Sequence, residues 1–540
     1  MTPAALGHAV RQVFAVAIVV AVCWPQASAA QSDAVAGELQ YIIQDGIATP
    51  GAEDDDERLI QVFTYYEDRS FKPLFVRDDG PKAKAKVLLE HLRNADGDGL
   101  DPGSYGIAEI EKRLADPSPV NLAEAEILFA RAMIDYGRDL TAGRVEPRKV
   151  NKSLFVYPHG PGPLTLLEGA EQAEDLGPFI ATLAPQTPNY ARLKEALAAH
   201  RTIAARGGWP KLPLAETLKP GMEDTRVATL RTLLETTGDL APGANAGDMY
   251  DGEIVEAVKR FQSRHGLEED GVIGPTTLAE LNVPVEERIV QIELNMERRR
   301  WMKDDLGERY IFVNLADQYL KVVENDKTIH TALLVVGKPY HSTPVFSEQM
   351  TYLELNPFWN VPPSIATNEY LPKLRRNPGV LERENIRVLA GGNSEVSPWA
   401  VDWASISGRF PYSLRQDPGP RNALGRIKFM FPNQFNVYIH DTPSKSLFAR
   451  ASRIFSHGCM RVQYPEQLAE VLLKEQGWTK AKLEQAIATG ERRVLKLKRT
   501  IPVYVTYLTA FANKDGSVHF RRDVYGRDKT LAAALQKARS

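Results

Sequence analysis

The spacing of apolar residues changes near residue 309, and this change constrains the fold more than any other feature of the sequence. Before it, apolar residues recur every three or four positions, as on one face of a helix, from Leu122 through Met133 to Leu140. After it, short apolar and β-branched runs bounded by turn residues dominate, as in 310–315 and 331–336. A chain of 540 residues also exceeds what one hydrophobic core serves. The sequence therefore predicts a multidomain α+β protein, helical in its first half and strand-rich in its second.

Turn residues and shifts in composition divide the chain further. The predicted units are a helical domain at 31–222, a small helical domain at 223–283, a linker helix at 284–308, a strand-rich domain at 309–515, and a C-terminal hairpin and tail at 516–540. Strands are expected at 310–315, 319–323, 331–336, 351–355, 435–439, 494–497, 503–507 and 518–520. An insertion at about 366–424, rich in charge, proline and glycine, interrupts the strands. It contains a helical stretch at 368–376 and a loop at 391–394, and its length predicts a lid over a functional site.

The first 30 residues have the organisation of a secretory signal peptide. Arg11 precedes an apolar run at 13–24, and the small residues at 27–30 offer an Ala-x-Ala cleavage site. The run is shorter than the roughly 20 residues that span a bilayer, which favours cleavage over anchoring. Cys23 has neighbours that suit a lipoprotein cysteine poorly. We therefore expect an exported, periplasmic protein whose mature form has Cys459 as its only thiol.

Two features are weak candidates for binding sites. The formal net charge of −3 gives no reason to expect a nucleic-acid partner, and the basic cluster at 298–300 is expected to be a solvated helix face or a local salt-bridge site. Residues 94–99 resemble the start of a calcium loop, but its twelfth position is Tyr105, where a glutamate is needed. The sequence therefore predicts a helix-closing turn there, and no cofactor or metal is expected.

The run Ser456-His457-Gly458-Cys459-Met460-Arg461 is the strongest candidate for a catalytic centre. A thiolate is a strong nucleophile, and a nearby histidine lowers the thiol pKa and takes its proton. His440 precedes Cys459 by nineteen positions and His457 by two. If 455–461 is extended, His457 and Cys459 point to the same side, and His440 approaches from the end of a neighbouring strand. These residue types alone are also compatible with an inert buried cysteine.

Two other classes of protein are compatible with the same residues. His440, His457 and Cys459 are all possible zinc ligands, although no His-Glu-x-x-His pair accompanies them. A zinc hydrolase is therefore the less favoured interpretation. An inactive enzyme retained as a binding scaffold is the other alternative, and the intact cysteine and histidines argue against it.

Several motifs resemble a known family. His440, a spacer, and Ser-His-Gly-Cys followed by an apolar residue and Arg461 resemble the signature of the YkuD-type L,D-transpeptidases. The runs 356–362, 419–433 and 440–444 resemble the large periplasmic, YcbB-like branch of this family. That branch has a helical scaffold domain, an inserted peptidoglycan-binding module and a capping insertion. The runs 99–102 and 207–210 fit the scaffold, and the runs 257–262, 266–267, 270–271 and 281–282 resemble the small peptidoglycan-binding domain of cell-wall enzymes.

The resemblance implies a reaction and a set of catalytic residues. Cys459 is expected to attack the third-residue carbonyl of a tetrapeptide stem, release D-alanine and pass the acyl group to the third-residue side-chain amine of another stem. His440 matches the general base, and His457 matches a supporting histidine. Backbone N–H groups at Gly458 and Cys459 are the expected oxyanion donors.

The resemblance also implies substrate contacts, partners and an alternative reaction. The expected substrate-binding residues are Trp359, Tyr438, Ser456 and Arg461, of which Arg461 suits a stem carboxylate. Core packing for Trp359 and Tyr438, and a structural hydrogen bond for Ser456, are equally compatible with the sequence. The expected partners are peptidoglycan stem peptides and glycan, other cell-wall synthases, and carbapenem β-lactams as covalent inhibitors. An L,D-carboxypeptidase or endopeptidase that uses water as the acceptor is the alternative function.

Overall fold

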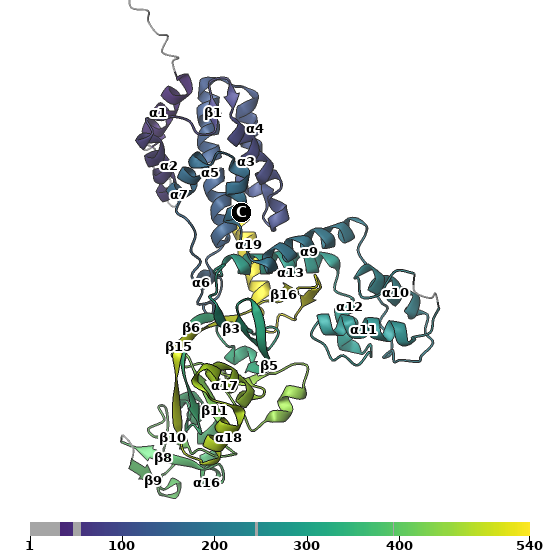
Figure 1. Cartoon of the computed structure of the whole chain (residues 1–540), viewed down its shortest axis with the longest axis vertical. Coiled ribbons are helices and arrows are strands. Elements are labelled where there is room, and N and C mark those ends of the chain that lie inside the picture. The colour runs from purple at the N-terminus through teal and green to yellow at the C-terminus, as the bar shows by residue number, and fades with distance from the viewer. Residues whose placement is uncertain (1–32, 47–55, 244–246, 392–393, 540) are drawn as a thin grey trace, which may run out of the picture.

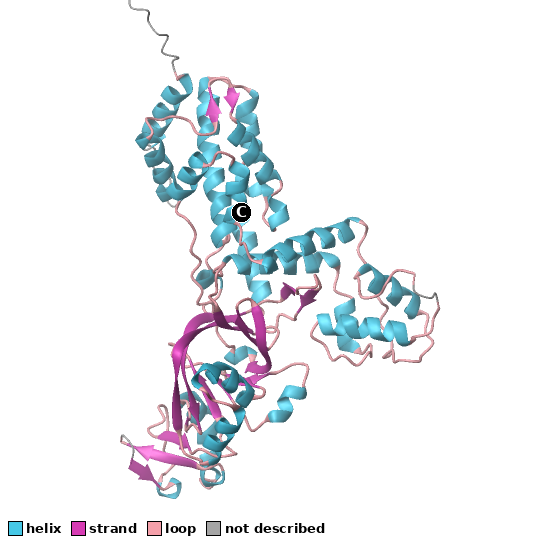
Figure 2. Cartoon of the chain, in the orientation of Figure 1, coloured by secondary structure: helices cyan, strands magenta, loops and turns pink. Residues whose placement is uncertain are grey.

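The computed structural model describes residues 33–46, 56–243, 247–391 and 394–539. The expected signal peptide at 1–30 lies outside this part, as do residues 392 and 393 of the expected loop at 391–394. Helices form one end of the molecule, a small helical domain projects from its side, and strands form the other end (Figures 1 and 2). The structure thus has the predicted multidomain α+β architecture. Within the described residues no helix is both long and apolar enough to cross a membrane.

The first helical domain is built around α5 (Pro119–Ala142), which is buried along most of its length. Ser118 caps this helix by accepting the N–H of Asn121 at 3.3 Å, and Pro119 takes the first helical position. The surrounding helices are α1 (Ala34–Gly46), α2 (Asp56–Asp68), α3 (Ala83–Arg93), α4 (Ile107–Ala115), α7 (Pro163–Gln172) and α8 (Leu176–Leu183). The short pair β1 (Val76–Arg77) and β2 (Gly80–Pro81) and the single turn α6 (Pro147–Val150) complete the domain. Residues 95–98 form the short helix η1 (Ala95–Asp98), as expected for a turn that closes α3.

Two long helices join this domain to the rest of the molecule. Helix α9 (Pro188–Ala205) packs against α13 (Val285–Arg300). The basic cluster at 298–300 lies in the last turn of α13, where Arg298 and Arg300 are buried and paired with Asp528 and Glu297. The expectation of a local salt-bridge site is therefore confirmed, and that of a solvated helix face is wrong.

The small helical domain contains α10 (Arg226–Thr236), α11 (Gly252–Arg264) and α12 (Pro275–Leu281). Asp251 caps α11 by accepting the N–H of Ile254 at 3.2 Å. The buried amide of Gln262 accepts the N–H of Gly271 at 2.9 Å and donates to the Asp270 carboxylate at 2.8 Å. The loop before α12 is thereby tied to α11 by a single side chain.

In the described part of the chain, nine strands form one mixed sheet in the order β13-β5-β14-β12-β11-β6-β15-β3-β4, and a pairing of β4 with β5 closes every strand except β13 into a ring. The strands are β3 (Arg309–Asn314), β4 (Tyr319–Glu324), β5 (Lys327–Gly337), β6 (Phe346–Leu355), β11 (Ile427–Met430), β12 (Ile439–His440), β13 (Ile454–Ser456), β14 (Met460–Val462) and β15 (Arg493–Thr506). Helices α17 (Pro465–Leu473) and α18 (Lys480–Ala488) contribute Leu468, Leu472 and Leu483 to the same core. Apolar residues of one sheet face fill this core, whereas alternate residues are left for the opposite face.

Four expected strands differ from those observed. The strand predicted at 435–439 is reduced to β12, because the Asn433 side chain accepts the N–H groups of Phe435 and Val437 and holds a loop in which Asn436 has a φ of 54°. The two strands predicted at 494–497 and 503–507 are one strand, β15, with a register shift inside it. The segment at 518–520 does not extend the main sheet.

The insertion folds as a unit with its own core, which we call the cap. It has a sheet of β7 (Trp359–Asn360), β10 (Ser413–Gln416), β8 (Ile386–Ala390) and β9 (Ser394–Val396), in that order. Its helical elements are α14 (Pro363–Ile365), the π-helix η4 (Ala366–Tyr370), α15 (Leu371–Leu374) and α16 (Val380–Arg383). Tyr370, Leu374, Leu381 and Trp403 are among its buried residues.

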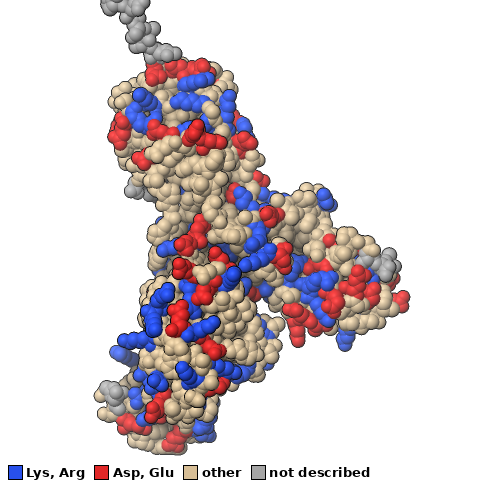
Figure 3. Space-filling view, in the orientation of Figure 1, with Lys and Arg blue, Asp and Glu red and all other residues tan. Residues whose placement is uncertain are grey.

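The C-terminal hairpin begins earlier than expected, and the expected tail is a helix. The hairpin consists of β16 (Ala510–Ala512) and β17 (Val518–Phe520), and α19 (Arg527–Arg539) follows it. On the face shown in Figure 3, acidic and basic side chains are interspersed, in keeping with the net charge of −3. The surface therefore lacks the single-sign field there that would attract a polyanion.

Candidate active site

Strand pairing brings the predicted site residues together. Strands β12 and β14 run parallel, with Ile439 beside Met460 and His440 beside Arg461. Ile439 and Met460 are fully buried in the core. Because alternate residues of a strand share a face, His440, Arg461 and the residues one step outside this register, Tyr438 and Cys459, belong to the opposite face.

Cys459 lies in a tight turn between β13 and β14. Gly458 has a φ of 113°, a conformation that glycine adopts without a Cβ penalty. The Ser456 hydroxyl donates to the Cys459 carbonyl at 2.5 Å and accepts the Gly458 N–H at 3.1 Å. Thr343 donates to the Gly458 carbonyl at 2.8 Å. The turn is thus held on both sides, and it presents the half-buried thiol at a fixed place.

These hydrogen bonds correct two expectations. The Gly458 N–H is already taken by Ser456, so it is not free to serve as an oxyanion donor here. Ser456 uses its hydroxyl for two hydrogen bonds within the turn, which is the structural alternative to a substrate contact. Among the described residues no acceptor takes the Cys459 N–H.

The segment 455–461 is not one extended strand, because the turn interrupts it. The expected reason for placing His457 and Cys459 on the same side is therefore wrong. His457 lies near the surface, where its Nε2 meets Glu369 Oε1 of the cap at 2.6 Å. Its ring also lies 5.1 Å from the ring of His341. His457 thus joins the turn to the cap.

His440 is buried and held in one orientation. Its Nδ1 lies 2.5 Å from the Asp441 carbonyl oxygen, which assigns the ring proton to Nδ1 and leaves Nε2 as the basic nitrogen. Burial and the positive charges of Arg461 and Lys428 lower the pKa of His440 to about 3, against the opposing effects of the Asp441 and Leu424 backbone carbonyls. The imidazole is therefore neutral at physiological pH and is able to accept a proton.

The thiol is also neutral in the resting structure. Burial raises the pKa of the Cys459 thiol, whereas the Tyr438 backbone N–H and side chain and the charges of Lys428 and Arg461 act in the opposite direction. The Sγ atom lies 3.7 Å from the Asn436 carbonyl oxygen. Burial likewise raises the pKa of Tyr438 far above its ordinary range, so its phenol remains a hydrogen-bond donor. The thiol and the imidazole are therefore both neutral on the same sheet face, and Tyr438, Lys428 and Arg461 would stabilise a thiolate at Cys459.

Of the remaining predicted residues, Arg461 and Tyr438 lie at the catalytic sheet and Trp359 lies in the cap. Arg461 is partly buried, and among the described residues its buried Nε has no hydrogen-bond partner. The Tyr438 ring lies 5.7 Å from that of His440. Trp359 is in β7 of the cap, with its ring 6.4 Å from that of Tyr370. Its packing is that of a half-buried member of the cap core at the border with the catalytic sheet.

Sequence reasoning missed several residues of the site. Lys428 of β11 is opposite His440, and its ammonium lies 4.1 Å from the Tyr438 ring centroid. Glu369 and Asn436 contact His457 and the thiol. Asp441 accepts the N–H groups of Arg426 and Thr442 at 2.8 and 2.6 Å. Alternation along β11 was the available signal for Lys428, because Ile427 and Phe429 are buried on either side of it.

In the described structure Cys459, His440 and His457 are not arranged as the ligands of one metal ion. In the part of the chain that the structure describes, no group of three or more histidine, cysteine, aspartate or glutamate side chains has a geometry that could hold a metal ion. His457 faces Glu369 and His440 faces a backbone carbonyl. The arrangement is that of a thiol and a neutral base on one sheet face, and it defines the class as α+β proteins with a cysteine–histidine site beside an inserted cap.

Comparison with known proteins identifies three domains of the chain. Residues 308–500 match the L,D-transpeptidase catalytic domain of the YkuD family, residues 61–197 match the Scaffold domain, and residues 223–281 match a domain described as "Putative peptidoglycan binding domain". The chain therefore contains a YkuD-type L,D-transpeptidase catalytic domain together with scaffold and peptidoglycan-binding-type domains.

The individual proteins that resemble this chain have low sequence identity to it or match only part of it. A protein of Haemophilus influenzae described as "Putative L,D-transpeptidase" is 33% identical over 244 residues, which are 45% of this chain and 49% of the relative. The chain thus spans about half the length of that curated relative. Solved L,D-transpeptidase structures from Xylanimonas cellulosilytica and Stackebrandtia nassauensis are 14% and 16% identical, cover 54% and 57% of this chain and 98% and 99% of their own, and have TM-scores of 0.18 and 0.22. With TM-scores this low, nothing about the site of this chain is inferred from these two structures.

Proposed function

We propose that this protein is a peptidoglycan L,D-transpeptidase that uses Cys459 as its nucleophile. The parallel pairing of β12 with β14 supports the proposal, because it puts His440, Tyr438 and Arg461 on the sheet face of the thiol. The match of residues 308–500 to the YkuD catalytic domain supports the same chemistry. Each role below is part of this proposal.

In the first step His440 Nε2 takes the thiol proton as Cys459 Sγ attacks the third-residue carbonyl of a tetrapeptide stem. The Cys459 N–H donates to the oxyanion that develops on the carbonyl oxygen. The C–N bond to the terminal D-alanine then breaks, and the imidazolium returns the proton to the leaving amine. A thioester between Cys459 and the shortened stem remains.

In the second step the side-chain amine of the third residue of another stem attacks the thioester. His440 takes a proton from this amine, the C–S bond breaks, and the thiolate recovers the proton. The product is a cross-link between two third residues. Water in place of the amine would give a shortened monomer, so the identity of the acceptor separates a transpeptidase from an L,D-carboxypeptidase or endopeptidase.

The site offers groups for both charge and orientation. Arg461 suits a stem carboxylate, because its guanidinium has an unpartnered buried Nε and lies on the site face. Tyr438 donates a hydrogen bond to the forming thiolate. Trp359 forms a border of the substrate slot beneath the cap. His457 supports the cap through Glu369 and does not transfer a proton.

The wider context of this function is part of the proposal. The apolar run at 13–24 and the small residues after it support export and a periplasmic location. The match of residues 223–281 supports attachment to peptidoglycan. Carbapenem β-lactams are proposed covalent inhibitors, because their strained carbonyl would acylate the same thiol, and other cell-wall synthases are proposed partners of the helical domain.

One product assay tests the function. The purified protein is incubated with disaccharide tetrapeptide, and the products are identified by mass spectrometry. We expect a cross-linked dimer together with one released D-alanine per bond, and no product from Cys459→Ala. Shortened monomer without dimer would replace the transpeptidase proposal with the carboxypeptidase alternative.

A second assay tests the base. Addition of a carbapenem mass to Cys459 is followed over time in the wild type and in His440→Gln. We expect the variant to be slower by roughly 100- to 10,000-fold, as for loss of a general base. Retention of circular dichroism and of binding to isolated peptidoglycan excludes misfolding as the cause. An unchanged rate would remove His440 from its proposed role.

A further inference from the structure

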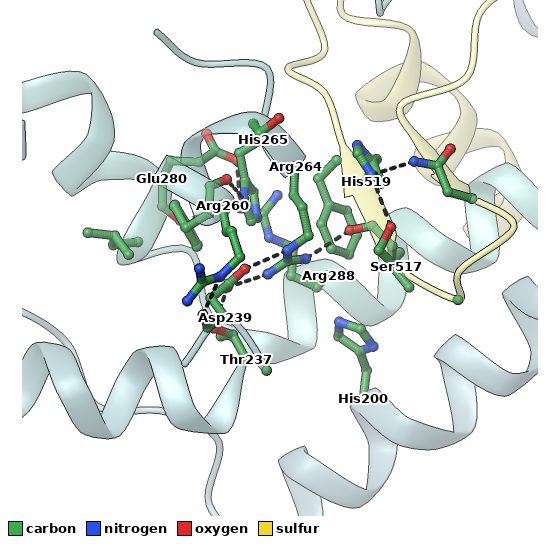
Figure 4. A pocket seen from close by; sticks show the side chains of 18 of the residues that line it. His200, Thr237, Asp239, Arg260, Arg264, His265, Glu280, Arg288, Ser517 and His519 are labelled. Atoms are coloured by element: carbon green, nitrogen blue, oxygen red, sulfur yellow. Dashed lines mark hydrogen bonds and ion pairs between the residues drawn. The ribbon is translucent and has the colours of Figure 1, made fainter. Parts of the chain in front are cut away.

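A cavity of about 520 Å³ lies where several separate parts of the chain meet (Figure 4). Its walls come from α9, from the small helical domain at 223–281, from the C-terminal hairpin, and from Trp209 and Arg288 of the segments that flank the small domain. Its volume is within the range of small-molecule sites. Arg264 joins the small domain to the hairpin by donating to the Val518 carbonyl at 2.8 Å. The cavity is thus a seam between units, and no single unit encloses it.

Aromatic rings and unused hydrogen-bond acceptors share this cavity. His200 projects from α9 toward Asp239, Arg264 and Ser517 (Figure 4), and its ring lies edge-on to those of Trp209 and Phe520, at 6.5 and 5.7 Å. Its Nδ1 lies 2.7 Å from the Ala196 carbonyl oxygen. The other nitrogen, Nε2, is then an acceptor on a neutral ring, since burial lowers the pKa of His200.

The other two histidines of the cavity are neutral as well. Burial, together with neighbouring arginines, lowers the pKa of His265 well below its ordinary value and that of His519 to about 4. His265 stacks on Phe261 at 3.8 Å, and His519 Nε2 lies 2.7 Å from the Asn513 amide nitrogen. The walls therefore offer flat rings and neutral acceptors, which suit a ligand with many hydroxyl groups.

Two charged residues of the cavity, Arg260 and Asp515, have no ion-pair partner among the described residues, and Ser517 donates to the Asp515 carboxylate from its N–H at 2.9 Å and from its hydroxyl at 2.6 Å. Arg264 forms a paired contact with the Asp239 carboxylate, and Arg288 donates to Glu280 at 2.6 Å. Arg260 donates from Nε to the Asp239 carbonyl at 2.9 Å, and within the described residues no carboxylate pairs with its guanidinium. Its two terminal nitrogens remain for a ligand, and their planar geometry suits a carboxylate.

We propose that this seam is a binding site for a carboxylate-bearing saccharide. The small domain supplies one wall of the site, and α9 and the hairpin supply the others. Aromatic rings contact the apolar faces of the sugars, His200 Nε2 accepts a hydroxyl hydrogen bond, and Arg260 binds the carboxylate. The proposal deepens the peptidoglycan attachment proposed above and rests on it for the source of the saccharide. A ligand in the seam also ties the small domain to the body of the protein.

The test is a calorimetric titration of the full chain carrying Cys459→Ala, so that no covalent chemistry contributes. Two tetrasaccharides of N-acetylated sugars are compared, a neutral one and one with two carboxylates from peptide-free glycan strands. We expect the carboxylate-bearing saccharide to bind about tenfold more tightly, as for one charge-assisted contact. Arg260→Gln should abolish this preference and leave the affinity for the neutral saccharide within about twofold.

Two further variants test whether the saccharide binds inside the cavity and not beside it. His200→Phe retains the ring and removes the acceptor, and it should weaken both saccharides by about fivefold. Lys259→Gln removes the same charge one position from Arg260, where Lys259 pairs with Glu256 outside the cavity, and it should bind as the parent does. Thermal unfolding verifies that each variant is folded.

Absence of binding by either saccharide at millimolar concentration would overturn the proposal. Equal affinities of the parent, Arg260→Gln and His200→Phe would also overturn it, because the saccharide would then bind elsewhere. Neither result bears on the acylation of Cys459, which is measured separately in the wild type.

Discussion

At the scale of single residues, the site depends on two groups that are both neutral before reaction. Burial raises the pKa of Cys459 and lowers that of His440, and Lys428 and Arg461 contribute positive charge to the same face. In the proposed mechanism this charge would disfavour an imidazolium before attack and stabilise a thiolate during it. Proton transfer is therefore expected to accompany attack on the carbonyl.

The neutral pair predicts a particular pH profile. His440, with a pKa of about 3, stays unprotonated above about pH 4, and the raised thiol pKa keeps Cys459 protonated through neutrality. The rate of acylation by a carbapenem should therefore be flat from about pH 5 to 8. A decline below pH 6.5, the ordinary histidine range, would contradict a buried neutral base. Circular dichroism at each pH distinguishes loss of fold from loss of rate.

Gly425 is a residue at which both backbone conformation and space exclude a side chain. Its φ is 62°, and a Cβ would meet the Asp441 carboxylate, which orders the backbone next to His440. We expect Gly425→Ala to lower the free energy of unfolding by about 2–4 kcal/mol and to slow acylation. Chemical denaturation measures the first effect and mass spectrometry the second.

Gly408 is the matched control for this substitution. Its φ of 73° is similar, but a Cβ there meets nothing within 4 Å. Gly408→Ala should cost only about 1 kcal/mol, the conformational part alone. Equal losses at the two glycines would show that contact with Asp441 is unimportant.

At the scale of elements, two parallel strands and a π-helix decide how the site is built. The parallel pairing of β12 with β14 brings together residues that a long loop separates in sequence. The π-helix η4 of the cap directs Glu369 to His457, beside the turn that holds the thiol. π-helical turns are rare and occur frequently at functional sites. The contact is the means by which the cap is joined to the catalytic sheet next to Cys459.

Glu369→Gln tests this connection. The variant loses the charge that favours the hydrogen bond to His457, so we expect faster amide hydrogen exchange in η4 and α15. The effect on overall stability should be below about 1 kcal/mol, because both side chains are partly exposed. Glu382→Gln is the control, since Glu382 binds Trp399 within the cap at 2.9 Å. Unchanged exchange in Glu369→Gln would show that other contacts hold the cap.

At the scale of the whole molecule, α13 connects the helical domain, the catalytic sheet and the C-terminal helix. Its buried Glu297 accepts the Arg144 N–H at 2.7 Å and pairs with Arg300 at 3.1 Å. Arg298 reaches Asp528 of α19. Charges buried to this degree are tolerated only when they are paired, so these contacts fix how the units are arranged.

Removing the charge of Glu297 should therefore loosen the assembly. We expect Glu297→Gln to lower the free energy of unfolding by about 3–5 kcal/mol, since it leaves Arg300 buried without its carboxylate. Scanning calorimetry should separate the unfolding of the helical domain from that of the catalytic sheet. Glu293→Gln breaks a more exposed pair with Arg201, and its expected loss is about 1 kcal/mol or less. A single unshifted transition in Glu297→Gln would contradict this role.

Much of the fold and the key part of the site could be predicted from local patterns. Helical spacing predicted the first half, and alternating or β-branched runs predicted β3, β4 and β5. The two-histidine, one-cysteine motif predicted Cys459 and His440 as catalytic residues because their chemistry depends on residue type, and the structure places both on one sheet face. The expected strand at 435–439 failed, since Asn433 satisfies nearby backbone groups with its side chain and local propensity does not include that competition.

By itself, the sequence determined the α+β division of the chain, the lone candidate thiol and the family signature, because these follow from periodicity and residue chemistry. Tertiary structure alone decided that the Gly458 N–H is taken by Ser456, that His457 faces Glu369, and that Lys428 stands opposite His440. It also decided that α9 and the hairpin close a cavity against the small domain. Each of these features depends on strand register or on contacts between distant segments, and such contacts are fixed by packing and by the pairing of buried polar groups.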